Sequence, residues 1–123
     1  MEFDDKLPIY YQIKQYFYHE IIVGRLALGA KLPSVRQIAV ALTVNVNTVQ
    51  RALAEMETEK VITSQRGKGN FVTEDVQRVL KLKEQLIQVQ LKQLYEELKA
   101  LNIGDDGMVT YLKQYIEMRR END

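Results

Sequence analysis

"SVRQIAVALTVNVNTVQRALAEMETEK", residues 34–60, contains two predicted helices that are joined by a very short turn. Ser34 is a favourable N-cap and Gln37 completes a capping box, so we expect a helix from residue 34 to about residue 42. Asn45 is a favourable N-cap for the next helix. The apolar residues of that helix recur at helical spacing, and they are Val49, Ala52, Leu53 and Met56. Two short helices joined by a tight turn are typical of a helix-turn-helix.

Arg36 lies in the first turn of the first of these helices. A cation at this end of a helix opposes the helix dipole at a cost of roughly 0.3 kcal/mol or more. A bound phosphate would offset that cost, because the helix N-terminus and the guanidinium both favour anions. The position of Arg36 therefore indicates an anionic partner.

The sequence on either side of residues 34–60 extends the motif. Between Pro8 and Gly24 the apolar spacing predicts an additional, preceding helix. In "VITSQRGKGNFV", residues 61–72, the apolar period changes to about two, which predicts short strands at 61–65 and 70–73 around a glycine-flanked tip. A helix-turn-helix followed by such a hairpin is a winged helix.

Two surfaces of this unit carry candidate chemistry for DNA. Opposite the buried stripe of the second helix of the motif lies a polar row of Asn47, Gln50, Arg51 and Ala54. In a major groove, Asn and Gln can pair with adenine and Arg can pair with guanine. The hairpin tip alternates Arg66 and Lys68 with glycines that allow close approach to a phosphate. The alternative interpretations are a solvated polar face and an ordinary charged turn.

The C-terminal part is predicted to contain two helices. Residues 74–101 contain no glycine or proline, which predicts one helix about 40 Å long, and "NIGDDG" at residues 102–107 separates it from a shorter one. The apolar stripe of the long helix is Val76, Leu80, Ile87, Leu91, Leu94, Leu98 and Leu101. That of the short helix is Met108, Tyr111, Leu112, Tyr115 and Ile116. We expect a second copy of the chain to cover these stripes in a four-helix arrangement; a monomeric hairpin is the alternative.

Composition limits the remaining classes of function. The chain has 123 residues and no net charge, but residues 25–72 carry seven bases and three acids, so this segment is positive. No apolar run approaches the roughly 20 residues that cross a bilayer, and the acidic "MEFDD" opening is no secretory signal. With no cysteine and with His19 as the one histidine, we expect neither a metal site nor catalytic residues, no cofactor, and a cytoplasmic location.

Four stretches resemble successive landmarks of the GntR family of bacterial winged-helix transcription regulators, from about residue 7 to residue 73. They are "PIYYQI", "IIVGRLALGAKLPSVRQIA", "VNVNTVQRALAEMETEKVI" and "RGKGNFV". The tail of about fifty residues resembles the two-helix dimerisation segment of the YtrA-type subfamily. The resemblance implies a mostly α-helical fold with a small β-hairpin, divided into a winged helix-turn-helix domain at 1–73 and a dimerisation segment at 74–123.

The resemblance also implies site residues. The DNA contacts would be Ser34, Arg36, Asn45, Val46, Asn47, Thr48, Gln50, Arg51, Arg66, Gly67 and Lys68. The dimer interface would be Leu80, Ile87, Leu91, Leu94, Leu98, Leu101, Tyr111 and Tyr115. Val46 and Gln50 stand where many members have arginine, which leaves guanine readout to Arg51 or the asparagines. Thr43 and Lys60 stand where glycine is frequent, which implies left-handed backbone at one or both.

We therefore expect a homodimeric regulator, a repressor rather than an activator, that binds a palindromic double-stranded DNA operator and no membrane. The residues identify no small-molecule effector. A protein-binding adaptor that uses the winged helix only as a scaffold is the alternative. The tyrosines are expected mainly in the core and interface, with a small-ligand pocket as a lesser possibility.

Overall fold

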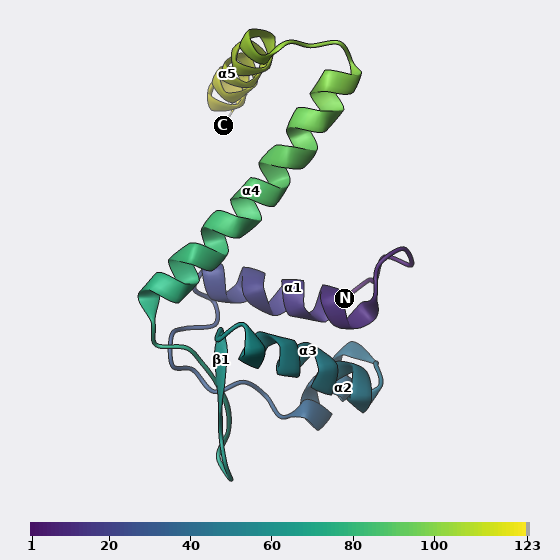
Figure 1. The fold of residues 1–123 in the computed structure, drawn as a ribbon, viewed down its shortest axis with the longest axis vertical. Coiled ribbons are helices and arrows are strands. Elements are labelled where there is room, and N and C mark those ends of the chain that lie inside the picture. Colours follow the sequence, from purple (N-terminus) through teal and green to yellow (C-terminus); the bar gives the residue numbers. More distant parts are fainter. Residues whose placement is uncertain (123) are drawn as a thin grey trace. The chain divides into compact units, whose positions relative to one another are not determined.

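The computed structural model describes residues 1–122, which form five helices and one antiparallel hairpin (Figure 1). The elements are α1 (Ile9–Ile22), α2 (Val35–Leu42), α3 (Val46–Thr58), β1 (Ile62–Gln65), β2 (Gly69–Val72), α4 (Val76–Ala100) and α5 (Asp105–Asn122). The mostly helical fold with one small hairpin confirms the predicted class. The chain divides into two compact units, residues 1–83 and residues from 84 onward, and each is described by itself.

The core of the first unit forms where α1, α2 and α3 meet. Ile13, Phe17 and Ile21 of α1 are buried, as are Ile38 and Ala39 of α2. All four apolar residues of the predicted stripe of α3 are also buried. Each fully buried large apolar side chain contributes roughly 1.5–3 kcal/mol, so this packing fixes which face of α3 points outward.

Side-chain caps and left-handed residues set the ends of α2 and α3. The capping box is confirmed: the Ser34 hydroxyl accepts from the Gln37 amide at 3.1 Å, and the Gln37 side chain accepts from the Ser34 amide at 2.9 Å. The Asn45 side chain accepts from the Asn47 amide at 2.7 Å. Thr43 and Lys60 both have positive φ, 56° and 63°, so the implied left-handed backbone occurs at both positions.

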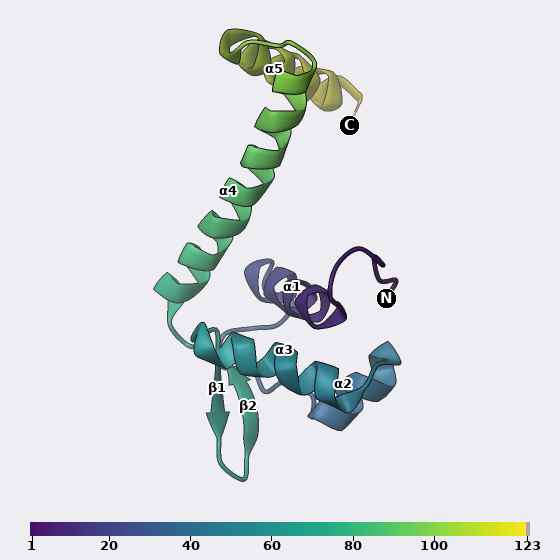
Figure 2. The same ribbon diagram turned by 45° about the vertical axis from the view of Figure 1, so that its right-hand side comes forward.

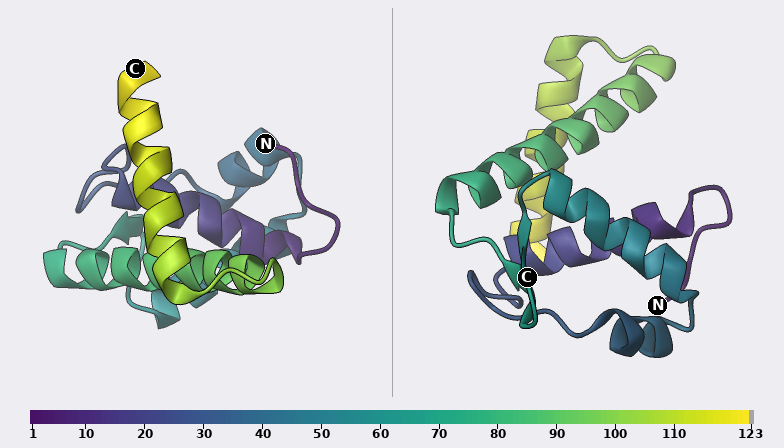
Figure 3. Two further views of the ribbon diagram at one scale, coloured as in Figure 1. Left: turned by 90° about the horizontal axis from the view of Figure 1, so that it is seen from above. Right: turned by 60° about the horizontal axis from the view of Figure 1, so that its bottom comes forward.

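A segment outside the hairpin pairs with β2, which was not predicted. β1 pairs with β2 in antiparallel register from Ile62 opposite Val72 to Gln65 opposite Gly69, one residue shorter at each outer end than predicted. The Val72 amide donates to the Ala30 carbonyl at 2.8 Å, and the Leu32 amide donates to the Asn70 carbonyl at 2.8 Å. The chain between α1 and α2 therefore runs alongside the hairpin (Figures 2 and 3). No strand is predicted for this segment from the sequence.

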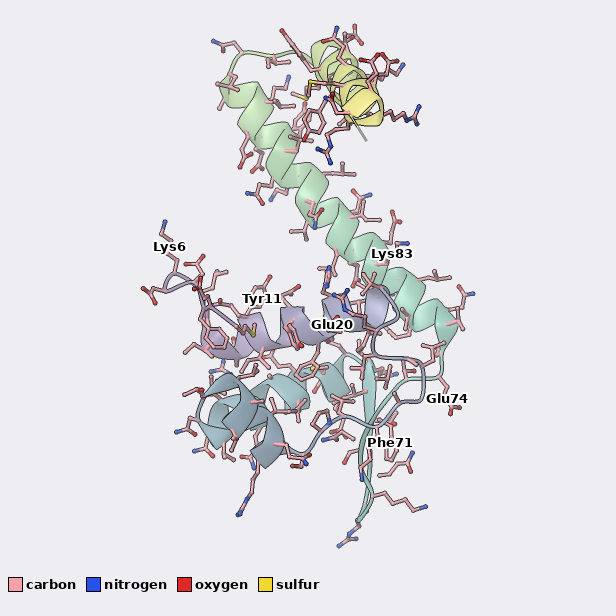
Figure 4. All side chains as sticks on the ribbon, turned by 180° about the vertical axis from the view of Figure 1, so that it is seen from behind. Lys6, Tyr11, Glu20, Phe71, Glu74 and Lys83 are labelled. Carbon is pink, nitrogen blue, oxygen red and sulfur yellow. The ribbon has the colours of Figure 1, made fainter. Side chains whose placement is uncertain are left out.

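α4 begins at Val76, two residues later than predicted, because Asp75 caps it. The Asp75 carboxylate accepts from the Gln77 amide at 3.0 Å. Figure 4 shows Phe71 on the hairpin and Glu74 on the link that leads into α4. Leu82 is the buried residue of α4, and it lies outside the apolar stripe that the sequence predicted.

The second unit contains the rest of α4 and all of α5. None of the described residues of α5 is buried. An open apolar groove of about 470 Å³ runs between the two helices, lined by residues such as Leu91, Leu94, Met108 and Leu112. None of the helices in residues 1–122 is long and apolar enough to span a membrane.

The left-handed backbone at Lys60 leads to a stability prediction. A side chain at positive φ costs roughly 1–2 kcal/mol, so we expect Lys60→Gly to raise the free energy of unfolding by roughly 0.5–1 kcal/mol after the entropy loss of glycine is deducted. The control Glu57→Gly replaces an exposed residue inside α3 and should lower it by roughly 1 kcal/mol. Urea denaturation measures both, and a destabilising Lys60→Gly would contradict the prediction.

Candidate nucleic-acid interface

The N-terminus of α2 presents an exposed arginine. Arg36 lies in the first turn, which contains no acidic residue. Arg36, Thr43, Asn45 and Val46 line a shallow hollow beside the turn between α2 and α3. The predicted position of Arg36 at the open end of a helix is thus present in the structure, next to the start of α3. Such an end attracts anions through its amides and its dipole.

A second hollow lies between α2 and the hairpin, and it contains two lysines. This groove of about 1000 Å³ is lined by Lys31, Ser34 and Gln37 on one side and by Lys68 and Asn70 on the other. Lys31 lies so close to the hairpin that a Cβ on Gly69 would be 3.1 Å from its Cε atom. The groove therefore combines two cations with the N-terminal end of α2.

Lys31 is one of the seven bases within residues 25–72, but it is not among the site residues predicted from the sequence. Its place depends on the pairing of the 29–32 segment with β2, where Lys31 lies opposite Phe71. The available signal was the alternation of "GAKL" before the helix, which fits a short extended segment. The partner strand, forty residues away in sequence, could not be identified from that signal.

The outward face of α3 carries most of the predicted row. Asn47, Gln50 and Ala54 are exposed, as is Val46 at 38% of its surface, whereas Thr48 is half-buried. The side-chain oxygen of Asn45 accepts the capping hydrogen bond, so the side-chain NH₂ group is the part that remains to contact a base. The amides of Asn47 and Gln50 thus stand on the exposed surface of a helix that the core holds in place.

Arg51 is turned toward α1. Its guanidinium carbon lies 3.8 Å from the centre of the Tyr10 ring, and its Nε atom lies 3.9 Å from a Glu55 carboxylate oxygen. Sequence analysis placed Arg51 in the same row as Asn47. The structure places its head group at the edge of that row, over an aromatic ring of the neighbouring helix.

Two of the three acids of the basic segment are held by α1. The Lys14 ammonium donates to Glu55 at 3.1 Å and to Glu59 at 2.9 Å, and the Tyr18 hydroxyl donates to Glu59 at 2.8 Å. Burial lowers the pKa of Lys14, but the hydrogen bonds to Glu59 and Glu55 outweigh burial and raise it overall. Burial, followed by the bond to Glu59, raises the pKa of Tyr18. These carboxylates therefore have cationic or hydrogen-bonding partners on α1.

The hairpin tip extends from the first unit as residues 66–68. Arg66, Gly67 and Lys68 are all exposed, and the Lys68 amide donates to the Gln65 carbonyl at 2.9 Å to close the turn. Gly67 has a φ of 76°, which only glycine adopts without strain. The two bases of the tip thus flank a glycine whose backbone is accessible.

Most of the predicted interface residues are exposed, and all lie on α4 or α5 except Leu101, because α4 ends one residue earlier than predicted, at Ala100. Seven of them, Leu80, Ile87, Leu91, Leu94, Leu101, Tyr111 and Tyr115, expose 40–70% of their surface, and Leu98 is half-buried. Large apolar side chains exposed together mark interaction surfaces. Leu80 belongs to the first compact unit and the other seven to the second.

Sites of another kind would involve metal-binding side chains or His19. Residues 1–122 contain no group of three metal-binding side chains. His19 is exposed, and its Nδ1 atom lies 3.4 Å from a guanidinium nitrogen of Arg25.

Comparison with known proteins agrees with this geometry. Residues 9–72 match the family described as bacterial regulatory proteins, gntR family. The HTH-type transcriptional repressor YtrA of Bacillus subtilis is 41% identical over 108 residues, 87% of this chain and 83% of that protein. A GntR family transcriptional regulator from Listeria monocytogenes superimposes with a TM-score of 0.85 at 38% identity, covering 91% of this chain and 98% of the other. The DNA-binding domain of AraR in complex with operator ORX1 has a TM-score of 0.53 at 25% identity, over 55% of this chain and 81% of the other.

The raised pKa values of Lys14 and Tyr18, the α1 residues that bind the acids of α3, lead to a second prediction. A group whose pKa is higher in the folded state stabilises below its unfolded pKa, and this stability is lost as pH rises through the folded value. For Tyr18 and Lys14 the loss begins near pH 10, so we expect the urea midpoint to fall between pH 9 and pH 11. Tyr18→Phe should make that fall shallower, and Tyr16→Phe, at an exposed position of the same helix, is the matched control. Identical pH profiles for the wild type and Tyr18→Phe would contradict this assignment.

Proposed function

Because this chain belongs to the GntR family of bacterial regulatory proteins, we propose that it is a transcriptional repressor that binds a palindromic operator as a homodimer. As a member of that family it is a DNA-binding transcription regulator rather than an enzyme. The repressor assignment is supported by the 41% identity to a protein named as a repressor. Operator DNA as the partner is supported by the similarity to the operator complex of AraR. We further propose that the protein acts in the cytoplasm, where bacterial DNA is located.

The observation that carries this proposal is the grouping of three exposed features on the first unit. These are the arginine-bearing end of α2, the amide row of α3 and the basic hairpin tip. In the proposed complex α3 lies in the major groove, and Asn47 and Gln50 read base edges. The DNA backbone is bound by Arg36, Arg66, Lys68 and the additional Lys31.

The remaining predicted contacts have supporting roles in this proposal. Ser34 and Asn45 cap the two helices and hold their N-termini toward the DNA. Val46 offers an exposed apolar surface to a thymine methyl group, and Thr48 lies half-buried beside it. Gly67 lets the hairpin backbone approach a phosphate or the minor groove. Residues 1–73 would thus supply the DNA contacts.

Residues 74–123 would supply dimerisation. The exposed apolar side chains of α4 and α5 favour burial against a second copy, since nothing within residues 1–122 covers them. A two-fold dimer carries one recognition helix per subunit. It therefore requires an inverted repeat whose half-sites are spaced by about whole helical turns.

Selection of bound sequences from a random duplex pool tests this function. We expect an enriched inverted repeat, bound at roughly 10⁻⁸ M or tighter and weakened steeply by salt. Enrichment of no sequence, with equal binding to every duplex, would contradict a sequence-specific regulator and favour the adaptor alternative.

Two substitutions distinguish the base-reading and phosphate-binding roles. Asn47→Ala should lower affinity for the enriched duplex by roughly 1–3 kcal/mol and relax preference at one position of each half-site, because a bidentate base contact is lost. Arg36→Ala should weaken binding to all duplexes alike and make the salt dependence shallower. Fluorescence anisotropy titrations at several salt concentrations measure both effects. An unchanged motif in Asn47→Ala would show that the proposed reading row is wrong.

Introducing a charged residue on the apolar face of α4 tests the proposed dimer. We expect the wild type to sediment at twice the 14.3 kDa chain mass and Leu91→Glu to sediment as a monomer. Gln90→Glu places the same charge one residue away at an exposed polar position and should stay dimeric. Leu91→Glu should also lose roughly tenfold or more in affinity for the enriched duplex, since two half-sites are no longer bound together. A dimeric Leu91→Glu would contradict this interface.

A further inference from the structure

We propose that Tyr10, on a helix outside the helix-turn-helix, is a positioning residue for DNA binding: it holds Arg51 at the flank of α3, where Arg51 binds a backbone phosphate rather than a base. This inference rests on the proposed function and deepens it, because it assigns a role to α1 and changes the role expected for Arg51.

The two helices are joined by three side-chain pairs at a constant offset. Tyr10 meets Arg51, Lys14 meets Glu55 and Tyr18 meets Glu59, each pair 41 residues apart in the chain. Both members advance by four residues from one pair to the next, so α1 and α3 lie side by side and run in the same direction (Figures 1 and 2). The first of these pairs lies nearest the N-terminal end of α3, which the proposed function places in the groove.

The stack over Tyr10 orients the guanidinium of Arg51. Its carbon lies over the ring, 3.8 Å from the ring centre, which is van der Waals contact distance. The ring accepts no conventional hydrogen bond, so this contact leaves the guanidinium N–H groups able to donate to another acceptor. The Arg51 side chain remains 64% exposed, so an external acceptor can reach those groups.

The direction of Arg51 favours phosphate over a base. A helix with its side chains is about 10–12 Å wide and nearly fills a major groove about 12 Å wide. Side chains on the flanks of the helix therefore face the phosphates along the groove walls. Because Arg51 leans toward α1 instead of standing with Asn47, its head group lies on such a flank.

The guanidinium of Arg51 is not hydrogen-bonded to Glu55, whose carboxylate accepts from Lys14 instead. The Arg51 Nε atom is 3.9 Å from one oxygen of Glu55, beyond hydrogen-bond distance, while the other oxygen accepts from Lys14 at 3.1 Å. Glu55 is thus drawn toward α1. Arg51 can then form a bidentate pair with a phosphate.

The test uses two probes, the duplex enriched by the wild-type protein and a shuffled duplex of equal length and composition. We expect Arg51→Gln to weaken binding to both by the same factor, roughly tenfold, and to reduce the salt slope by about one. Tyr10→Leu should weaken binding roughly two- to fivefold when Arg51 is present and not at all in the Arg51→Gln background. Tyr10→Phe keeps the ring and should bind like the wild type.

Two results would overturn the inference. One is an equal loss from Tyr10→Leu with and without Arg51, which would mark Tyr10 as purely structural. The other is a changed base preference in Arg51→Gln, which would mark Arg51 as a base reader. Equal wild-type affinity for the two duplexes would contradict the proposed function, not this inference. The salt slope measures the phosphate contact of Arg51 even when binding shows no sequence preference.

The stack itself is measurable without DNA. The ring current of Tyr10 should shift the NMR signals of the Arg51 side-chain protons upfield, and the shift should persist in Tyr10→Phe and vanish in Tyr10→Leu. The same samples report whether Tyr10→Leu is folded. A wild-type spectrum without that shift would also overturn the proposal.

Discussion

The burial of one face of α3 is the constraint on which the first unit depends. Its stripe of Val49, Ala52, Leu53 and Met56 is buried in the core. Because the side chains of a helix point in fixed directions, burial of this stripe determines which residues can face outward. The same helix thus supplies the core and the candidate reading surface.

Charge is distributed around α3 in a way that net charge does not reveal. The whole chain is neutral, and the acids of α3 would oppose DNA if they pointed toward it. Instead, Glu55 and Glu59 bind Lys14, and Glu59 also accepts from Tyr18. The bases Arg36 of α2 and Arg66 and Lys68 of the hairpin tip are exposed. Besides supporting the core beside α3, α1 thus provides one ammonium and one hydroxyl to the two acids on the flank of that helix.

The proposed DNA-binding and dimerisation surfaces consist of different residues. Apart from Val40 and Val46, the larger exposed side chains of α2, α3 and the hairpin are polar or charged, whereas those of α4 and α5 include many large apolar side chains. Apolar exposure of this extent favours self-association, and polar amides with bases favour a hydrated, charged partner. In the proposed dimeric regulator, no residue would have to serve both DNA binding and dimerisation.

Local interactions were predictable from the sequence, because their partners lie within a few residues. The Ser34–Gln37 capping box, the Asn45 cap and the buried stripe of α3 follow from spacing alone, and resemblance to the family added the left-handed Thr43 and Lys60. Only the tertiary structure decided the contacts that join distant segments: Lys31 beside the hairpin, the burial of Leu82, and Arg51 on the ring of Tyr10. The physical reason is that helical periodicity gives the direction of a side chain but not what lies in that direction. The partner is determined by how α1, α3 and the hairpin pack around a shared core.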